Sequence, residues 1–433
     1  MDLILIGIIG IVFLFFLILI GVPIAFAMAF TGIIGLGIIE GPSATLAHIG
    51  LIPWEHGRDF IFVAIPLFIL MGQIFYHAGL ASDLYQSLSK LVGQVPGGVA
   101  IASVLACGGF GAITGSSIAT VATMGSIIMP EMKKFKYNPQ LATGVLAASG
   151  TLGILIPPSL IFIFYGVMTE TSISKLFIAG ILPGFITVIM FTLIIFVRCI
   201  INPMLGPKGP KSSAKEKLYA IKNLIPLFGL FILIIGGIYI GAFTPTEAAG
   251  VGCLIVSLMA LNKKNLSIKI FLSATKATVL ISSMIFLIII GGYIVAKFIA
   301  ITGITELLIS FIIDSNLNRI GFLIFLIILY ILLGSMLDVF GMIVLTVPFL
   351  MPIISQLGID PIWFGVFIVI MAEVGLITPP IGANVFVMKK VAKDIPMSTI
   401  FLGVIPFFVG ELIIIAILII WPEIPLILVN KMS

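Results

Sequence analysis

The chain carries the same pattern of prolines twice, 222 residues apart. The matching positions are Pro23 and Pro245, Pro130 and Pro352, Asn138-Pro139 and Asp360-Pro361, and Pro157-Pro158 and Pro379-Pro380. The loop after Pro130 contains three lysines, and the equivalent loop after Pro352 contains none. Further along the chain the lysines lie in the second copy instead, in residues 388–394, whereas residues 167–172 of the first copy contain none. Because cytoplasmic loops of membrane proteins are enriched in Lys and Arg, equivalent loops are expected on opposite sides of a membrane. The pattern predicts two repeats of inverted topology.

Composition places both repeats in a bilayer. Hydrophobic residues make up 61% of the chain and charged residues 9%, against about 25% charged in a soluble domain. Apolar runs such as residues 60–76, 278–296 and 399–421 have the length that a membrane crossing needs. The net charge of +5 lies in short loops, which argues for orientation rather than nucleic-acid binding. No basic region precedes the first apolar run, so it is interpreted as a retained span and not a signal peptide.

The expected fold is an all-α polytopic membrane protein of two inverted repeats, each with five spans and a re-entrant helical hairpin. Residues 1–206 form the first repeat, with a hairpin at about 98–130 and a broken helix at about 139–168. Residues 207–222 are a cytoplasmic linker. Residues 223–433 form the second repeat, with a hairpin at about 319–352 and a broken helix at about 361–388. Residues 82–92 and 262–276 are amphipathic enough to lie flat on the inner surface, although ordinary loops are an alternative.

Loop charge gives the orientation. With the N-terminus outside, residues 81–97, 131–138, 198–223, 262–277 and 388–397 face the cytoplasm. Of the 22 Lys and Arg, only Arg58, Lys175, Lys297, Arg319 and Lys431 lie outside these stretches. The opposite orientation would place most positive charges outside. Both termini are therefore predicted to be periplasmic.

Four segments place small and polar residues where a spanning helix would be continuous: residues 108–117, 149–159, 334–341 and 373–384. Backbone groups freed inside a bilayer cost several kcal/mol unless they are satisfied, and the double prolines forbid a continuous helix. Freed carbonyls together with the hydroxyls of Ser116, Ser149, Thr151 and Thr378 would suit an alkali cation, and the following helix N-termini would suit an anion. The alternative is that these residues only permit kinks or tight packing.

Ionisable and amide side chains near these breaks are further candidates. Asp338 is expected to assist cation binding, fix the hairpin tip, or act as an N-cap. Glu373 either completes a site or caps its loop. Asn384 offers its amide to a substrate or ties the broken helix together. Glu411 has no polar neighbour in sequence, and contact with a partner subunit is an equally good expectation. Thr114 and Ser335 join Asp338, Glu373 and Asn384 as candidate substrate contacts.

Several motifs resemble the large membrane subunit of tripartite ATP-independent periplasmic (TRAP) transporters. They are residues 22–30, 64–75, 108–125, 150–166, 243–252 and 378–387. FTPTEAAGVG at 243–252 and the two double-proline loops are the most specific, and the similarity extends from about residue 5 to residue 420.

The resemblance implies an elevator-type transporter that imports organic acid anions, such as C4-dicarboxylates, sialic acid or other sugar acids, with sodium across the bacterial inner membrane. It implies a small four-helix membrane subunit, expected here as a separate chain, and a periplasmic substrate-binding protein. It also implies at least two Na⁺ sites. The first would use Ser116, Ser117, Ser149, Gly150, Thr151, Gly153 and Pro157. The second would use Gly334, Gly375, Thr378 and Ile381, mostly through carbonyl oxygens.

Two rival functions remain to be compared. A one-component ion-coupled anion transporter of similar architecture would need no binding protein. An intramembrane enzyme is disfavoured, because HExxH and GxSxG motifs are absent and the three histidines lie away from the breaks. The three cysteines lack CxxC spacing and are interpreted as packing residues. No phosphate-binding loop of the GxxxxGK[ST] type occurs.

Overall fold

The structure is a computed structural model that describes residues 2–209, 211–307, 310 and 318–432. All regular secondary structure in this part of the chain is helical, so the predicted all-α class is confirmed. Pro210 of the predicted linker, and residues 308–309 and 311–317 of the predicted second repeat, lie outside the described residues.

Helices of the first half are α1 (Leu3–Leu19), α2 (Ile24–Glu40), α3 (Pro42–Gly57), η1 (Phe60–Val63), α4 (Ala64–His77), α5 (Leu80–Val92), α6 (Gly98–Thr114), α7 (Ser117–Lys134), α8 (Pro139–Ser149), α9 (Leu152–Leu155), α10 (Leu160–Met168) and α11 (Ile173–Ile201). Those of the second half are α12 (Ala214–Tyr239), α13 (Pro245–Asn262), α14 (Ile268–Thr302), α16 (Arg319–Gly334), α17 (Val339–Gln356), α18 (Pro361–Ile377), α19 (Ala383–Val391), α20 (Met397–Ile420) and α21 (Leu426–Val429).

The spacing of 222 residues recurs in these boundaries. Helices α7 and α17 begin 222 residues apart, and so do α8 and α18. The last pair also share their cap: Asn138 accepts hydrogen bonds from the first backbone N–H groups of α8, and Asp360 does the same for α18. In each case a proline occupies the first helical turn, where its missing N–H costs nothing. The repeated Asn/Asp-Pro pairs therefore set two equivalent helix starts.

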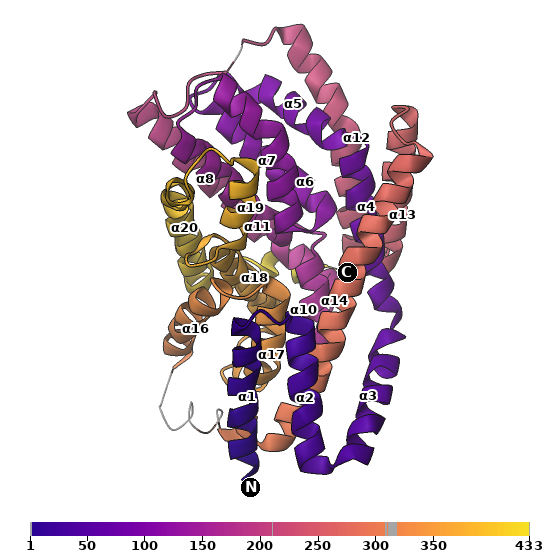
Figure 1. Cartoon of the computed structure of the whole chain (residues 1–433). Coiled ribbons are helices and arrows are strands. Elements are labelled where there is room, and N and C mark those ends of the chain that lie inside the picture. The colour runs from indigo at the N-terminus through magenta and orange to yellow at the C-terminus, as the bar shows by residue number, and fades with distance from the viewer. Residues whose placement is uncertain (1, 210, 308–309, 311–317, 433) are drawn as a thin grey trace.

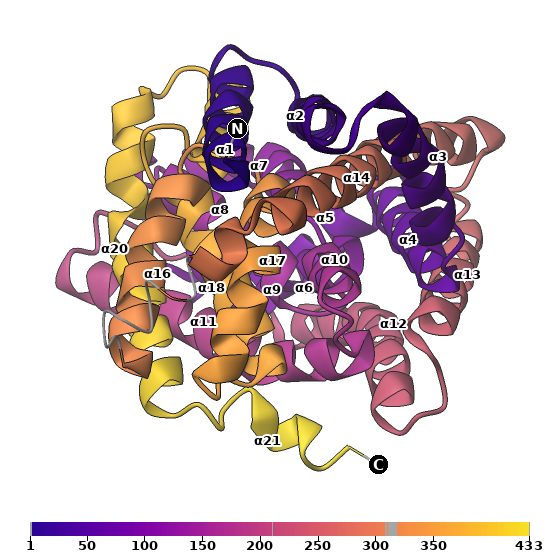
Figure 2. The same cartoon turned by 90° about the horizontal axis from the view of Figure 1, so that it is seen from below.

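The two hairpins lie in opposite halves of the molecule. Figure 1 shows α6 and α7 in the upper half, and α16 and α17 in the lower half. Helices α11 and α20, equivalent by their spacing, pack against one another, and α8 packs on α20. Seen from below, α12 and α13 lie on one side of the molecule, and α16 and α20 lie on the other (Figure 2).

Two details differ from the sequence-based expectations, and a third agrees with them. The predicted linker at 207–222 is partly helical, because Ser213 and Glu216 form a capping box that starts α12 at Ala214. Residues 268–276 are not a separate surface segment, since they form the first part of α14, which continues for 35 residues. Residues 82–92 do belong to a short separate helix, α5, which packs on α6 and α12.

Helix length permits several membrane crossings. Seven helices within the described ranges are long and apolar enough to span a bilayer, and the bent pair Pro139–Leu155 and Leu160–Met168 (45°) makes an eighth. Helices α1 and α2, at 17 residues each, lie at the lower limit of what can cross. Helix α17 is long enough to cross, although the sequence assigned it to a hairpin.

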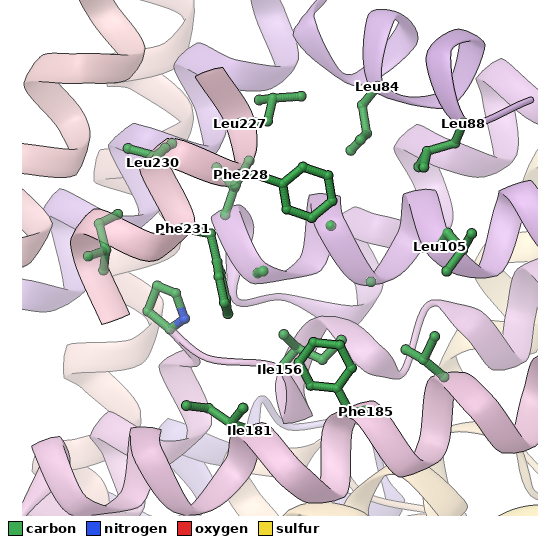
Figure 3. Close-up of a pocket in the computed structure, with 17 residues that line it drawn as sticks. Leu84, Leu88, Leu105, Ile156, Ile181, Phe185, Leu227, Phe228, Leu230 and Phe231 are labelled. Atoms are coloured by element: carbon green, nitrogen blue, oxygen red, sulfur yellow. The ribbon is translucent and has the colours of Figure 1, made fainter. Parts of the chain in front are cut away.

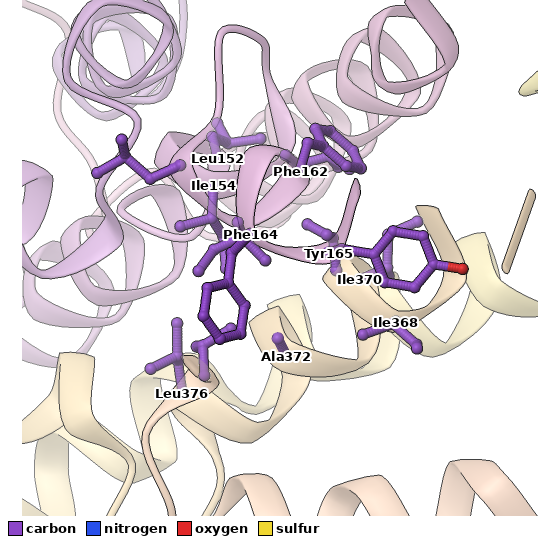
Figure 4. Packing of buried hydrophobic residues seen from close by; sticks show 14 of the residues in the cluster. Leu152, Ile154, Phe162, Phe164, Tyr165, Ile368, Ile370, Ala372 and Leu376 are labelled. Carbon is purple, nitrogen blue, oxygen red and sulfur yellow. The ribbon is translucent and has the colours of Figure 1, made fainter. Parts of the chain in front are cut away.

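The broken helices of the two halves pack on each other at the centre. Leu152, Phe162, Phe164, Ile370 and Leu376 are all buried, and Figure 4 shows the side chains of α9 and α10 packed over α18. The Tyr165 hydroxyl donates to the Pro361 carbonyl (2.7 Å) and so ties α10 to the start of α18. Rigid packing at this place fixes both breaks relative to one another.

Candidate functional site

The tip of the first hairpin rests on the first helix break. Helix α6 ends at Thr114, and Ser116 caps α7 by accepting a hydrogen bond from the Ala119 N–H (3.4 Å). A Cβ built on Gly153 of α9 would lie 2.8 Å from the Ser116 carbonyl oxygen. The backbone of Gly153 also lies in direct contact with the backbone of Gly111 in α6. Only glycine permits this approach, which brings the tip carbonyl to the break.

Hydroxyl and amide groups gather around this tip. The Thr120 hydroxyl donates to the Ser116 carbonyl oxygen (2.7 Å) and lies 3.5 Å from that of Thr114. Asn384, from α19 of the second half, is fully buried and donates to Ser117 Oγ (2.7 Å) and to the Ala147 carbonyl oxygen (3.1 Å). Asn384 therefore links the second broken helix to the first hairpin and α8, a contact between the two halves that the sequence did not predict.

The second hairpin meets the second break in the equivalent way. A Cβ built on Gly375 of α18 would lie 2.6 Å from Gly334 Cα and 3.0 Å from the Gly334 carbonyl oxygen. The Ile381 N–H donates to the Ser335 carbonyl oxygen (3.2 Å), and the Thr378 hydroxyl donates to the Val374 carbonyl oxygen (2.6 Å). The fold thus brings together five predicted site residues, although more than 30 residues separate the hairpin from the break. They are Gly334, Ser335, Gly375, Thr378 and Ile381.

Asp338 has the N-cap role that was one expectation for it. Its Oδ1 accepts a hydrogen bond from the Gly341 N–H (2.6 Å) at the start of α17. An aspartate at this position also interacts favourably with the positive end of the helix dipole.

A third group of polar side chains lies around Thr151 of the first break. Glu373 of α18, Glu411 of α20 and Ser149 of α8 are each 0% exposed. The Thr151 hydroxyl donates to the Ala148 carbonyl oxygen (2.7 Å) and to Glu411 Oε1 (3.2 Å). Among the residues that the structure describes, no hydrogen-bond partner is found for Ser149 Oγ, either carboxyl oxygen of Glu373, or Oε2 of Glu411. Buried oxygens without a donor favour a positive charge beside them.

The electrostatic character of the site follows from these groups. The three salt bridges among the described residues all lie elsewhere. Carbonyl, hydroxyl and carboxylate oxygens are hard donors that suit alkali cations. Helices α7, α10 and α19 begin at the breaks or at the first hairpin tip, so their N-terminal dipole ends favour an anion there, whereas the N-terminus of α17 is already capped by Asp338. Cation-binding and anion-binding groups are thus available side by side.

One ion pair ties the base of the first hairpin to the second half. Lys133 Nζ, at the end of α7, donates to both carboxylate oxygens of Asp394 (2.7 and 2.9 Å). These hydrogen bonds from the Lys133 ammonium hold the pKa of Asp394 below its usual range. Both side chains are exposed, so the pair contributes little to stability.

Two residues of this region were missed or misread in the sequence. Thr120 was not singled out, although it lies one helical turn after Ser116 and its hydroxyl binds the Ser116 carbonyl oxygen. Glu411 was considered for contact with a partner subunit, but it is buried inside this chain against Thr151. No pattern near residue 411 signals this contact, because its partner is 260 residues away.

The chain matches the family described as "Tripartite ATP-independent periplasmic transporter, DctM component" over residues 11–424. It is 35% identical over 382 residues to the C4-dicarboxylate TRAP transporter large permease of Pseudomonas aeruginosa, covering 87% of this chain and 88% of the relative. It is 30% identical to the sialic acid TRAP large permease of Vibrio cholerae (94% and 95% covered) and to the ectoine TRAP large permease of Halomonas elongata (95% and 96%). Among solved structures, the Alcanivorax borkumensis YdaH transporter is similar in fold (TM-score 0.59, 14% identity, 89% of both chains).

Proposed function

Because this chain belongs to the tripartite ATP-independent periplasmic transporter family as its DctM component, we propose that it imports an organic acid with sodium. The substrate class includes C4-dicarboxylates, sialic acid and other sugar acids. The observation that carries the proposal is the paired contact between a hairpin tip and a helix break, Gly153 on Ser116 and Gly375 on Gly334. Each contact places backbone carbonyls and hydroxyls beside helix N-termini, which suits a cation and an anion bound together.

Two sodium ions are proposed as transported cargo, one at each hairpin tip. The first would be held by oxygens of Ser116, Ser117, Ser149, Gly150, Thr151, Gly153 and Pro157. The second would be held by oxygens of Gly334, Gly375, Thr378 and Ile381. The unpartnered Ser149 hydroxyl supports the first site, because a buried hydroxyl without a partner is costly unless a ligand uses it.

The substrate is proposed to bind between the two tips, near Thr114, Ser117 and Asn384. The buried Asn384 amide joins α19 of the second half to the first hairpin and α8, so its position depends on how the two halves are arranged. A substrate oxygen that replaces Ser117 as its partner would connect substrate binding to that arrangement. Ser335, Asp338 and Glu373 complete the proposed set from the second half.

Membrane potential supplies a useful driving force for such a cycle. If two sodium ions accompany one monovalent anion, one net positive charge enters per cycle. A potential of about 100 mV then contributes roughly 2.3 kcal/mol, or accumulation of roughly fifty-fold at about 1.4 kcal/mol per factor of ten. The sodium concentration gradient adds to this value. Uptake therefore needs no ATP.

The remaining parts of the proposal concern movement and partners. The hairpins and broken helices would move together as an elevator against the other helices, since they pack tightly on one another. A separate small four-helix membrane subunit and a periplasmic binding protein would complete the system, in the inner membrane, with both termini of this chain in the periplasm. The binding protein would select the substrate.

Uptake by proteoliposomes tests the coupling directly. The vesicles would contain this chain, its small subunit and the binding protein, with sodium and proton gradients imposed separately. Accumulation should require the sodium gradient, and accumulation that is undiminished without it would contradict the proposal.

A double variant tests the two cation sites together. Ser116→Ala with Thr378→Ala should lower the apparent sodium affinity of uptake, while Ser267→Ala at the exposed cap of α14 serves as the control. An unchanged sodium dependence in the double variant would remove these two hydroxyls from the site.

A further inference from the structure

Two different environments adjoin the first helix break, one apolar and one polar. The apolar one is a cavity of about 300 Å³ between α5, α6, α11 and α12, which reaches Ile156 and Pro158 (Figure 3). Apolar residues line its walls, so the cavity offers no ligand to an ion. The polar one contains the carboxyl groups of Glu373 and Glu411, named here the carboxyl pair, and both are fully buried. Of the two environments, only the carboxyl pair can bind an ion.

Thr151 connects the carboxyl pair to the first break. Its hydroxyl donates to Glu411 Oε1 (3.2 Å). Its neighbours in the loop face in another direction, since Gly150 contacts α7 and Gly153 lies against the Ser116 carbonyl oxygen of the hairpin tip. The Thr151 side chain therefore lies on the α20 side of the break, away from the hairpin tip.

Two contacts show how α18 and α20 run past each other. Trp363 Nε1, near the start of α18, donates to the Leu418 carbonyl oxygen (3.2 Å), near the end of α20. Gly382, just after α18, lies against the ring of Phe401 near the start of α20. The two helices are therefore antiparallel. The glutamate of α18 lies about 15 Å after Trp363, and that of α20 lies about 10.5 Å before Leu418, so they differ in height by only about 5 Å.

Glu373 faces this place rather than the second hairpin. Gly375 lies against Gly334 of α16, and two residues turn an α-helix by about 200°. Glu373 is therefore on the other side of α18 from α16. Helix α18 also packs on α9, which begins one residue after Thr151, and on α20. The carboxyl pair and the Thr151 hydroxyl thus come together where α9, α18 and α20 meet.

Basic side chains on the helices packed against α18 and α20 lie elsewhere, as far as the described residues extend. Arg319 of α16 lies over the ring of Trp363 (5.8 Å), which is about 15 Å along α18 from Glu373. The Lys389 ammonium of α19 donates to two backbone carbonyl oxygens. The others are exposed or lie in the last turn of α11: Lys175, Lys390 and Arg198. A buried negative charge without a partner is costly, so the pair needs a positive charge from outside the chain.

Three oxygens of the carboxyl pair have no hydrogen-bond partner among the described residues: Oε1 and Oε2 of Glu373 and Oε2 of Glu411. One proton joins at most two oxygens, whereas a metal ion binds all three together with a hydroxyl. We propose that Glu373, Glu411 and Thr151 bind a hard metal cation at a third site, separate from the two hairpin tips. Carboxylate and hydroxyl oxygens suit Na⁺ and Ca²⁺ alike. The described part of the chain contains no cluster of three or more His, Cys, Asp or Glu side chains, which argues against a transition metal.

Thermal unfolding measures this binding without transport. The chain is purified in detergent with any membrane subunit that accompanies it, and divalent ions are removed by a chelator. Sodium and calcium are then titrated separately, while choline chloride keeps the ionic strength constant. The ion that raises the midpoint in wild type, and whose effect weakens in the variants below, is the ligand. Because unfolding does not depend on uptake, the site stands whether or not sodium drives transport.

Glu411→Gln keeps the size of the side chain and an acceptor for Thr151, but removes the charge. Without added cation this variant should be more stable than wild type, because a buried unpaired charge is gone. It should need a roughly tenfold higher cation concentration to reach half of its gain in stability. Glu373→Gln should show the same shift and serves if Glu411→Gln does not fold. The control, Glu55→Gln at an exposed position of α3, should respond as wild type does.

The hairpin-tip sites are separated from this one by Ser116→Ala with Thr378→Ala. Cation stabilisation should persist in that double variant and weaken further when Glu411→Gln is added. If the double variant alone loses the whole response, the hairpin-tip sites stand and the third site is wrong. If Glu411→Gln is more stable than wild type but keeps the wild-type half-saturation for both ions, the carboxyl pair carries a proton instead and the proposal fails.

Discussion

Replacing Ser149 by alanine separates a structural role of its hydroxyl from sodium binding. Ser149 is fully buried at the end of α8, and its Oγ has no hydrogen-bond partner in the described part of the chain. A buried hydroxyl that is unsatisfied costs about 1–3 kcal/mol. Without sodium, Ser149→Ala should therefore be more stable than wild type, with a thermal midpoint raised by roughly 1–3 °C.

Sodium should reverse this order. A ligand stabilises the folded state by RT ln(1 + [L]/Kd), so a tenfold weaker site loses about 1.4 kcal/mol of stabilisation at saturating sodium. Thermal unfolding of the detergent-solubilised protein would be followed across a sodium titration, with potassium keeping the ionic strength constant. The variant should gain less stability from sodium and need a higher concentration to reach half of its gain.

Ser103→Ala is the matched control. Ser103 is also fully buried in a helix, but its hydroxyl donates to the Val99 carbonyl oxygen (2.7 Å) and is satisfied. Its replacement should leave the sodium midpoint unchanged. A wild-type sodium midpoint in Ser149→Ala, or a lower stability than wild type in sodium-free buffer, would contradict the assignment of the Ser149 hydroxyl to the sodium site.

Three other changes test the packing and the charges. Gly375→Ala places a methyl group 2.6 Å from a Cα atom of α16 and should destabilise by about 1–3 kcal/mol in thermal unfolding, whereas Gly250→Ala, with open space around it, should stabilise its helix. Ser159→Ala removes the cap of α10 and should cost about 1–2 kcal/mol, measured in the same way; an unchanged midpoint would show that α10 needs no cap. Because hydrogen bonds from Lys133 lower the pKa of Asp394, its contribution is complete at neutral pH and is lost on acidification. The stability difference between wild type and Asp394→Asn should therefore begin to shrink as the pH falls below about 4 and vanish only below the lowered pKa of Asp394 in the folded state, and a difference that persists in stronger acid would contradict this assignment.

Residue patterns alone indicate the repeat, the helix starts and the places where helices break. Proline and Asn/Asp act within one helical turn, so the caps at Asn138 and Asp360 and the ends of α9 and α18 could be predicted from neighbouring residues alone. Composition and length determined the membrane class, because a bilayer selects long apolar helices whatever their tertiary arrangement.

Which distant side chains meet depends on how the whole chain packs. Asn384 reaches Ser117 across 267 residues, and Thr151 reaches Glu411 across 260. Such contacts depend on how the two halves pack. That packing depends on close backbone contacts such as that of Gly375 with Gly334, which no periodic pattern in the sequence indicates. The same holds for the cavity beside α12, since a space between helices belongs to their arrangement and to no single helix.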